Sequence, residues 1–319
     1  MRSILAALAA ALAASSALAQ QPWPSRAVKI VVPFGVGGPA DLYARFLASR
    51  LGEALGQSFV VENRPGGGAI VGTEAVAKSA PDGHTLLMMS NTHTVNETLI
   101  PQKPYELLRD LAPIAGVNYS DLLMVVHPSV PAANLKEFIA LAKAKPRGLN
   151  YASSGPGTPY HMAGELFKHM AGVDLVHVPY KGSDGARVAI LGGQVHMMID
   201  AITTMAPNVR AGKVKAMGTT GRTRSTVLPE VPTLAEAGVP GYEAGIWLGL
   251  MAPAGTPRPI LERLNAEVVK VLNAPDVKEA WTRQGAQPMP MTIAEFERFL
   301  REEIPKWGAL VRATGMKPE

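Results

Sequence analysis

Short apolar runs that alternate with longer amphipathic stretches constrain the fold of this chain more than any other feature. The runs are rich in valine, isoleucine, leucine and methionine and lie at Val28 to Val32, Phe59 to Val61, Thr85 to Met89, Leu122 to His127, Leu175 to Val178, Val195 to Ile199 and Val214 to Met217. Between them, apolar residues recur with helical spacing. Strands that alternate with helices form parallel sheets covered by helices on both faces. The sequence therefore predicts an α/β fold.

Capping signals indicate where the helices begin and end. A helix is predicted over Ala40 to Leu55, and Gly56 is suited to end it. Asn134 and Glu137 have the spacing of a capping box, and the helix that follows should stop before Pro146. Two later helices are expected to begin at Thr256-Pro257 and at Thr292 with Glu295.

The residue composition excludes several classes of site. The chain of 319 residues has no cysteine, which excludes disulfides, thiol catalysis and cysteine-ligated metals. It has no phosphate-binding P-loop and no G-x-S-x-G nucleophile motif. The turn Gly155-Pro156-Gly157 misses the dinucleotide-binding fingerprint, because Tyr160 stands where that motif needs its third glycine. The 7 histidines form no i, i+4 pair, so we expect neither a metal nor a cofactor.

The charged residues favour a small anion over a nucleic acid as the partner. Lysine and arginine total 31 against 26 acidic residues, for a formal charge of +5. The basic residues are dispersed along the chain and lack the interleaved aromatic residues of a nucleic-acid platform. A modest positive balance suits an anionic small molecule.

Residues 1–19 have the pattern of a secretory signal peptide. Arg2 is followed by an apolar run from Ile4 to Ala14 and then by Ala17-Leu18-Ala19, a small-residue cleavage pattern. The run is shorter than the roughly 20 residues that a membrane-spanning helix needs. We therefore expect cleavage after Ala19 and a protein that acts outside the cytoplasm and does not insert into the membrane.

Two glycine-rich turns lead into predicted helices. The first contains Gly35, Val36, Gly37 and Gly38, and Pro39 follows at the first helical position, where a missing N–H has no cost. Glycines leave the backbone N–H groups uncovered at the helix end that carries about +0.5 of dipole charge. Such an end binds anions.

The second turn repeats this design with added hydroxyl groups. Ser153, Ser154, Gly155, Gly157 and Thr158 precede a proline at the first helical position, and Thr158 is a good N-cap. Two such turns that face each other would hold a small carboxylate from both sides.

Two predicted strands are candidates for crossovers between two lobes. If the chain crosses at Leu122 to His127 and returns at Val214 to Thr219, one lobe comprises residues 20–122 and 218–319 and the other comprises 123–217. Ligands of open α/β sheets bind at the carboxyl ends of the strands. A ligand cleft is therefore expected between the lobes, with one glycine-rich turn on each side.

Two side-chain assignments stay open at this point. Asp41, at the third helical position, can satisfy its own helix end or bind a ligand amine. His161 and Glu165 lie one helical turn apart with Ser154 nearby, so a secreted serine hydrolase that uses Ser154, His161 and Glu165 is an alternative to a binding protein.

The whole mature chain resembles the Bug-type (TctC-like) solute-binding receptors of tripartite tricarboxylate transporters. The matching stretches occur in the same order as in that family: Ile30 to Phe34, Gly37-Gly38, Asp41, Val61 to Gly66, Pro81 to Leu87, Val126 to Ser129, Tyr151 to Glu165, His177 to Gly182, Leu191 to Val195, Pro232-Thr233, Glu236 to Gly238 and Ala252 to Pro257. The resemblance implies a two-lobed periplasmic binding protein of type II, a Venus flytrap with two crossover strands. It also implies a non-enzymatic monomer that binds a small carboxylate and meets either the membrane subunits of a transporter or a signalling partner.

The same resemblance implies which residues touch the ligand. These are the two turns, extended to Phe34, Asp41 and His161, and residues after other strands: Asn91, Thr92, His93, Tyr180, Asp200 and Ala201. Asp184 and the stretch Ile202-Thr203-Thr204 depart from the pattern of the family. Asp184 either complements the dipole of the next helix or faces the cleft, and in the second case a simple dianion is disfavoured as the ligand.

Overall fold

The computed structural model describes residues 23–317, so the predicted signal peptide lies outside the described residues. The strands are β1 (Val28–Val32), β2 (Phe59–Asn63), β3 (Thr85–Ser90), β4 (Leu111–Val126), β5 (Asn150–Ser153), β6 (Val176–Pro179), β7 (Met197–Ala201), β8 (Lys215–Thr219), β9 (Gly245–Pro253) and β10 (Ala286–Pro288). The helices are α2 (Pro39–Leu55), α3 (Ile70–Ala77), α4 (Asn91–Leu99), α5 (Leu107–Asp110), α6 (Leu135–Ala144), α7 (Pro159–Ala171), α8 (Ser183–Leu191), α9 (Ile202–Arg210), α10 (Leu234–Ala237), α11 (Arg258–Asn273), α12 (Pro275–Arg283) and α13 (Ile293–Thr314). The strands alternate with helices over most of this order, as predicted.

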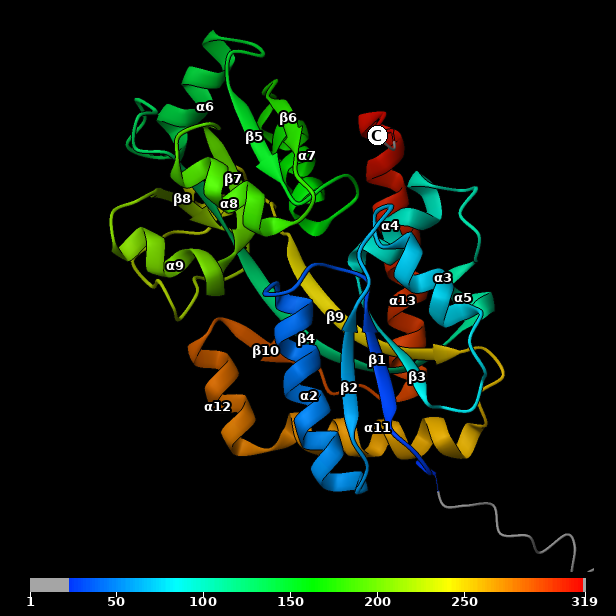
Figure 1. Ribbon diagram of the computed structural model, residues 1–319. Coiled ribbons are helices and arrows are strands. Elements are labelled where there is room, and N and C mark those ends of the chain that lie inside the picture. The colour runs from blue at the N-terminus through cyan, green and yellow to red at the C-terminus, as the bar shows by residue number, and fades with distance from the viewer. Residues whose placement is uncertain (1–22, 318–319) are drawn as a thin grey trace, which may run out of the picture.

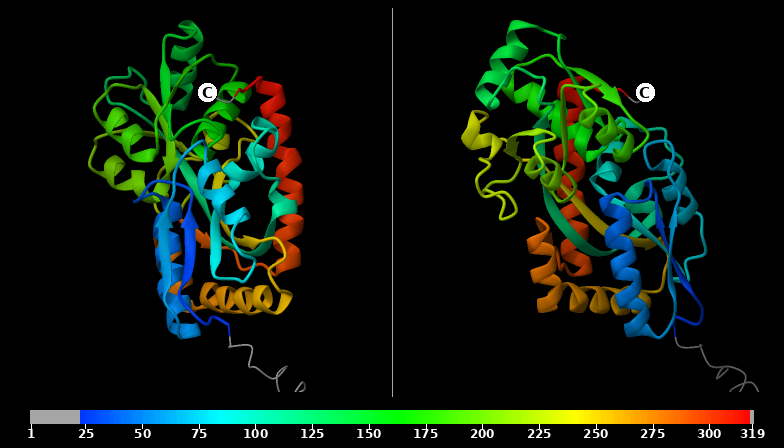
Figure 2. Two further views of the ribbon diagram at one scale, coloured as in Figure 1. Left: turned by 45° about the vertical axis from the view of Figure 1, so that its right-hand side comes forward. Right: turned by 60° about the vertical axis from the view of Figure 1, so that its left-hand side comes forward.

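The long strand β4 connects two lobes. Its first part, Leu111–Asp121, pairs with β9 in the sheet that also holds β1, β2, β3 and β10. Its last part, Leu122–Val126, pairs with β7 and β8 in the second sheet, which β5 and β6 complete. Figure 1 shows the first lobe below and the second above, with β4 running between them. The two views of Figure 2 show the same division.

The sheets are mixed rather than parallel, which corrects the expectation from the sequence. Pairs β1·β2, β1·β3, β5·β6 and β5·β7 are parallel, but every pair that involves β4 or β9 is antiparallel. The cause is the direction of travel: β4 carries the chain out of the first lobe and β9 brings it back. Strand–helix alternation predicts the local crossovers but does not reveal these two connecting strands.

The packing of the second lobe extends beyond the predicted boundary. The run predicted as the returning crossover forms β8, which pairs with β4 inside the second sheet. Leu228 and Val231 pack in the core between β4, β7 and α9, and Tyr242 and Ala244 pack in the core on the other face. The bounds of the two lobes therefore stay a proposal, in which we place the return of the chain at the start of β9.

An apolar cluster joins the lobes on one side. Met162, from α7 of the second lobe, packs with Val95 and Leu99 of α4 and with Trp307 and Val311 of α13. Figure 1 shows α13 rising beside α4 towards the second lobe. The lobes are thus in contact in this structure. Within the described range, no helix is long and apolar enough to cross a membrane.

Candidate functional site

The first glycine-rich turn presents free backbone N–H groups at the start of α2. The N-cap residue Gly38 has extended backbone angles and no side-chain cap, and Gly37 adopts φ +80°. Gly37 N–H donates to Asp41 Oδ2 at 3.0 Å. Among residues 23–317, no hydrogen bond engages the N–H groups of Gly35, Val36 or Gly38. These groups lie at the N-terminal end of a 17-residue helix, where the helix dipole favours a negative charge, so the predicted role of this turn as an anion site stays a proposal.

Asp41 stabilises this turn from the inside. Its side chain is buried and forms an ion pair with Arg45 at 2.9 Å, besides the bond from Gly37. Burial tends to raise the pKa of Asp41, but the bonds from Arg45, Gly37 and Asn63 outweigh burial and lower it. Asn63 also holds the turn, because its Nδ2 donates to Phe34 O at 3.2 Å. Of the two assignments left open, the structure favours a carboxylate that orders its own helix end.

The second turn is closed on itself. Gly155 N–H donates to Ser153 Oγ at 3.1 Å, and Gly157 N–H donates to His161 Nδ1 at 3.1 Å. Thr158 caps α7 through His161 N–H and also donates from Oγ1 to Gly155 O at 2.7 Å. The glycine N–H groups expected to face a ligand therefore already have partners, which corrects the symmetric picture of two equal anion sites. The sequence did not reveal that His161 Nδ1 would accept the hydrogen bond from Gly157 N–H, in the place expected for an anion.

A stack of aromatic rings contacts the second turn. The rings of His161 and His177 lie 4.0 Å apart between centroids, and Tyr151 stacks on His177 at 4.9 Å. Ser153 Oγ lies 2.6 Å from His177 Nε2. Burial lowers the pKa of His161 to about 4, with a smaller effect from Lys168, and burial and then His161 lower that of His177 to about 3. At neutral pH both rings are therefore uncharged.

The arrangement does not support the serine hydrolase. Glu165 Oε1 accepts from Tyr151 Oη at 2.6 Å and from Lys168 Nζ at 2.7 Å, so it is engaged elsewhere. His161 Nδ1 is held by the turn, and no hydrogen bond among the described residues joins Ser154 to His161. Glu165 is also buried.

The predicted residues after β3 are buried where that strand meets α4. His93 Nδ1 accepts from Ser90 N–H at 3.1 Å and its Nε2 lies 2.9 Å from Thr73 Oγ1. Burial lowers the pKa of His93 to about 4, despite its bond to the Ser90 backbone. Asn91 Nδ2 donates to Gly245 O at 3.0 Å, while Asn91 Oδ1 and Thr92 Oγ1 have no partner in the described part of the chain. His93 therefore acts as a structural residue, and Asn91 and Thr92 keep free acceptors.

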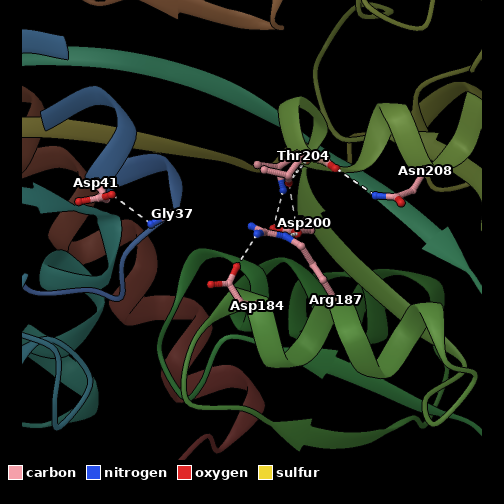
Figure 3. A network of polar contacts seen from close by, with 8 residues as sticks. Gly37, Asp41, Asp184, Arg187, Asp200, Thr204 and Asn208 are labelled. Carbon is pink, nitrogen blue, oxygen red and sulfur yellow. Dashed lines mark hydrogen bonds and ion pairs between the residues drawn. The ribbon is translucent and has the colours of Figure 1, made fainter. Parts of the chain in front are cut away.

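A polar cluster occupies the inner side of the second lobe. Asp200, at the end of β7, is fully buried and receives Arg187 Nε at 2.6 Å and Ala201 N–H at 2.8 Å. Arg187 Nη1 also binds Asp184 Oδ1 at 2.8 Å, and Thr204 Oγ1 donates to Asp200 at 3.3 Å. Figure 3 shows this cluster opposite the turn of Gly37 and Asp41.

Sequence reasoning did not single out Arg187. Burial lowers its pKa, but Asp200 and Asp184 raise it more, so the guanidinium stays charged. Its i, i+3 spacing from Asp184 on α8 was the available signal. Its pairing with Asp200, 13 residues away, depends on the tertiary fold.

The turns of the two lobes approach each other closely. A Cβ added to Gly37 would lie 4.0 Å from Asp184 Oδ2, and one added to Gly157 would lie 2.8 Å from Leu99 Cδ2. Asp184 therefore faces the first turn across the lobes. Tyr180 joins the second turn through its backbone, since its N–H donates to Ser153 O at 3.0 Å. Two surface hollows, between α2 and α11 and along the start of α13, are lined by none of the predicted site residues.

Comparison with known proteins agrees with this geometry. The sequence profile described as "Tripartite tricarboxylate transporter family receptor" matches residues 43–316. Protein BugT of Bordetella pertussis is 39% identical over 297 residues, which cover 92% of this chain and 91% of BugT. The structure of R. palustris Rpa4515 with adipate is similar with a TM-score of 0.89 and 35% identity, covering 93% of this chain and 100% of that one.

A second solved structure, MatC from Rhodopseudomonas palustris with bound malate, has a TM-score of 0.84 and 36% identity. Its similarity covers 91% of this chain and 100% of MatC. The predicted resemblance and the two-lobed periplasmic binding protein fold are thereby confirmed. The chain belongs to the tripartite tricarboxylate transporter receptor family, a family of periplasmic solute-binding receptors.

Proposed function

We propose that this protein captures a small carboxylate between its lobes and presents it to the membrane subunits of a tripartite transporter. The observation that carries the proposal is the first turn, where Gly35, Val36 and Gly38 hold unengaged N–H groups at the start of α2. Three neighbouring N–H donors without partners, together with the helix dipole, favour a negatively charged oxygen group. The wall opposite them belongs to the other lobe, so the bound group would contact both.

The arrangement of the lobes supports capture by closure. The turn of Gly157 lies against α4, and the cluster around Met162 joins α7 to α4 and α13. These contacts exist only while the lobes are together. A ligand that touches both lobes binds the closed state better than the open one and shifts the population towards it.

The relatives support the ligand class and the place of action. Rpa4515 was solved with adipate and MatC with malate, and both ligands are carboxylates. Receptors of this family belong to transporters, so the mature protein would act in the periplasm and release its ligand to a membrane partner.

Equilibrium binding to purified protein tests the proposal. The protein is unfolded in denaturant, dialysed to remove any ligand that it carried, refolded and titrated calorimetrically with mono-, di- and tricarboxylates. We expect one-to-one binding of at least one carboxylate. If no carboxylate binds or raises the thermal unfolding midpoint, the proposal is refuted.

A charge variant shows whether the first turn is the site. Val36→Asp adds a carboxylate to an exposed residue of the turn, so repulsion should weaken carboxylate binding by about tenfold or more. Val60→Asp adds the same charge to an exposed residue of β2, away from the turn, and should bind like the parent protein. If the two variants bind the carboxylate with equal affinity, the first turn is not the binding site.

A further inference from the structure

Arg187 carries a donor group that the protein itself does not satisfy. Its Nε and Nη1 bind Asp200 and Asp184, at 2.6 Å and 2.8 Å. Its Nη2 is buried and has no hydrogen-bond partner in residues 23–317. A guanidinium has only donors, so Nη2 requires an acceptor from outside this set.

Tyr160 adds a second group of this kind beside the first. Its side chain is 3% exposed, and its hydroxyl has no hydrogen-bond partner in the part of the chain that the structure describes. Burial raises the pKa of Tyr160, and the side chains of Asp200, Arg187 and Ser183 lie close enough to shift it as well, which places the hydroxyl beside the Arg187 cluster. Buried polar groups usually have partners in native proteins, so the two donors beside Asp200 are groups that an acceptor on a ligand would satisfy.

This cluster lies where the far end of a bound ligand would reach. Asp184, which holds Arg187, faces Gly37 across the lobes, with 4.0 Å between its Oδ2 and a Cβ placed on Gly37. In Figure 3 the cluster and the first turn stand opposite each other. A carboxylate held by the first turn would therefore direct its other end towards Arg187 and Tyr160. Because Nη2 is buried in this structure, in which the lobes are in contact, a ligand would have to reach it before the lobes come together.

The charges around Arg187 restrict what that end can be. One guanidinium is flanked by two carboxyl groups, Asp184 and Asp200, so the side chains of the cluster carry no excess positive charge. A second ligand carboxylate would therefore find no uncompensated cation and would be repelled by Asp184. An ammonium group cannot accept a hydrogen bond from Arg187. A neutral acceptor, such as a carboxamide, keto or hydroxyl oxygen, satisfies both donors without added charge.

We propose that Arg187 and Tyr160 select the ligand by its far end and favour a monocarboxylate with a neutral acceptor there over the matching dicarboxylate. This inference rests on the proposed function, because it takes the first carboxylate as bound at the Gly35–Gly38 turn. The ligands in the two related structures, adipate and malate, are dicarboxylates, so this preference would distinguish the protein from those relatives.

Ligands that differ only at one end test the selection. Adipate, adipamate, hexanoate and ε-aminohexanoate share one carboxylate and chain length, and end in a carboxylate, a carboxamide, a methyl and an ammonium group. Succinate, succinamate, butyrate and γ-aminobutyrate repeat the series on a shorter chain. In at least one series we expect the amide to bind about tenfold tighter than the other three members.

Variants then assign the selection to the two residues. Tyr160→Phe removes only the hydroxyl and should reduce the preference for the amide over the methyl compound by about fivefold or more. Arg187→Gln combined with Asp200→Asn removes the ion pair as a whole and should abolish that preference. Tyr242→Phe is the matched control, because its hydroxyl donates to Ala163 O at 2.7 Å elsewhere in the same lobe. It should keep the parent preference.

The outcomes separate this inference from the proposed function. If neither these compounds nor any carboxylate of the calorimetric screen binds, both fail. If carboxylates bind but the dicarboxylate equals or exceeds the amide in both series, the inference fails and the carboxylate receptor stands. If Tyr160→Phe and the double variant both keep the amide preference of the parent protein, the proposed roles of Tyr160 and Arg187 are refuted. Circular dichroism of each variant confirms folding, and Tyr160→Phe decides alone if the double variant does not fold.

Discussion

The contact between Gly157 and α4 allows a direct test of capture by closure. A Cβ on Gly157 would lie 2.8 Å from Leu99 Cδ2 and 3.3 Å from Asn96 Oδ1, both in the other lobe. Leu99 is itself buried in the cluster with Met162 and Trp307, so it has little room to move aside. We predict that Gly157→Ala disfavours the closed state and weakens ligand binding without touching the anion-binding turn.

The size of the effect follows from two separate costs. Gly157 has φ +69°, and an alanine there costs about 1 kcal/mol in any state of the protein. Crowding against Leu99 and Asn96 adds about 1–2 kcal/mol, but only while the lobes are closed. Only the second cost changes the closure equilibrium, so the dissociation constant should rise about 5- to 30-fold.

Gly172→Ala is the matched control for this variant. Gly172 ends α7 in the same lobe with φ +63°, but a Cβ there meets nothing within 4 Å. It should share the loss of about 1 kcal/mol in unfolding free energy and bind ligand like the parent protein. Calorimetric titration with the best carboxylate measures affinity, and urea unfolding measures stability. The reasoning is refuted if Gly157→Ala and Gly172→Ala bind equally tightly.

Two further predictions concern the stability of the fold. His93 and His161 are buried with their pKa values lowered to about 4 from 6.5, so the unfolded chain binds more protons and stability falls as pH drops from about 6.5 towards 4. Between pH 7 and pH 5, each of these two histidines should lower the free energy of unfolding by about 2 kcal/mol, which urea unfolding at both pH values measures. Unchanged stability at pH 5 would contradict the conclusion that both rings are buried in their neutral form. Asp41→Asn should lower the unfolding free energy by about 1–2 kcal/mol, because it weakens bonds from Arg45 and Gly37 to a buried carboxylate. Asp276→Asn, which removes an exposed ion pair with Arg50, should cost about 0.5 kcal/mol or less, and equal losses would show that Asp41 does not order its turn.

Local sequence signals predicted the elements that carry the site. The run Val28 to Val32 is β1, and the helix expected from Ala40 to Leu55 is α2, which begins one residue earlier at Pro39. The capping box of Thr292 and Glu295 is present at the start of α13. Such elements depend on side chains and capping groups close together in the chain, so they can be read from the sequence.

Elements that depend on the tertiary fold were missed. β9 is buried along its entire length and forms a continuous apolar run, which periodicity alone does not distinguish from a segment of a buried helix. The first part of β4 contains Pro113 and Gly116, which weaken a strand signal, but β9 pairs with it along its length. The sequence therefore placed the return of the chain at the run that forms β8, whereas we propose that it lies at the start of β9.

The candidate site, like the fold, could be predicted only where its geometry depends on residues close together in the chain. The first turn was predicted with its free N–H groups, because glycine and proline positions determine its geometry. The second turn appeared equivalent, but its glycine N–H groups bind Ser153 and His161. The pair of Arg187 and Asp200 joins a helix to a strand end, and no local pattern connects those two residues.

A crystal structure of the refolded protein with its tightest-binding carboxylate tests the central claim most directly. The account predicts one carboxylate group within hydrogen-bond distance of the N–H groups of Gly35, Val36 and Gly38, with the rest of the ligand between the lobes. Ligand density at any other place, with those three N–H groups left to solvent, would contradict it.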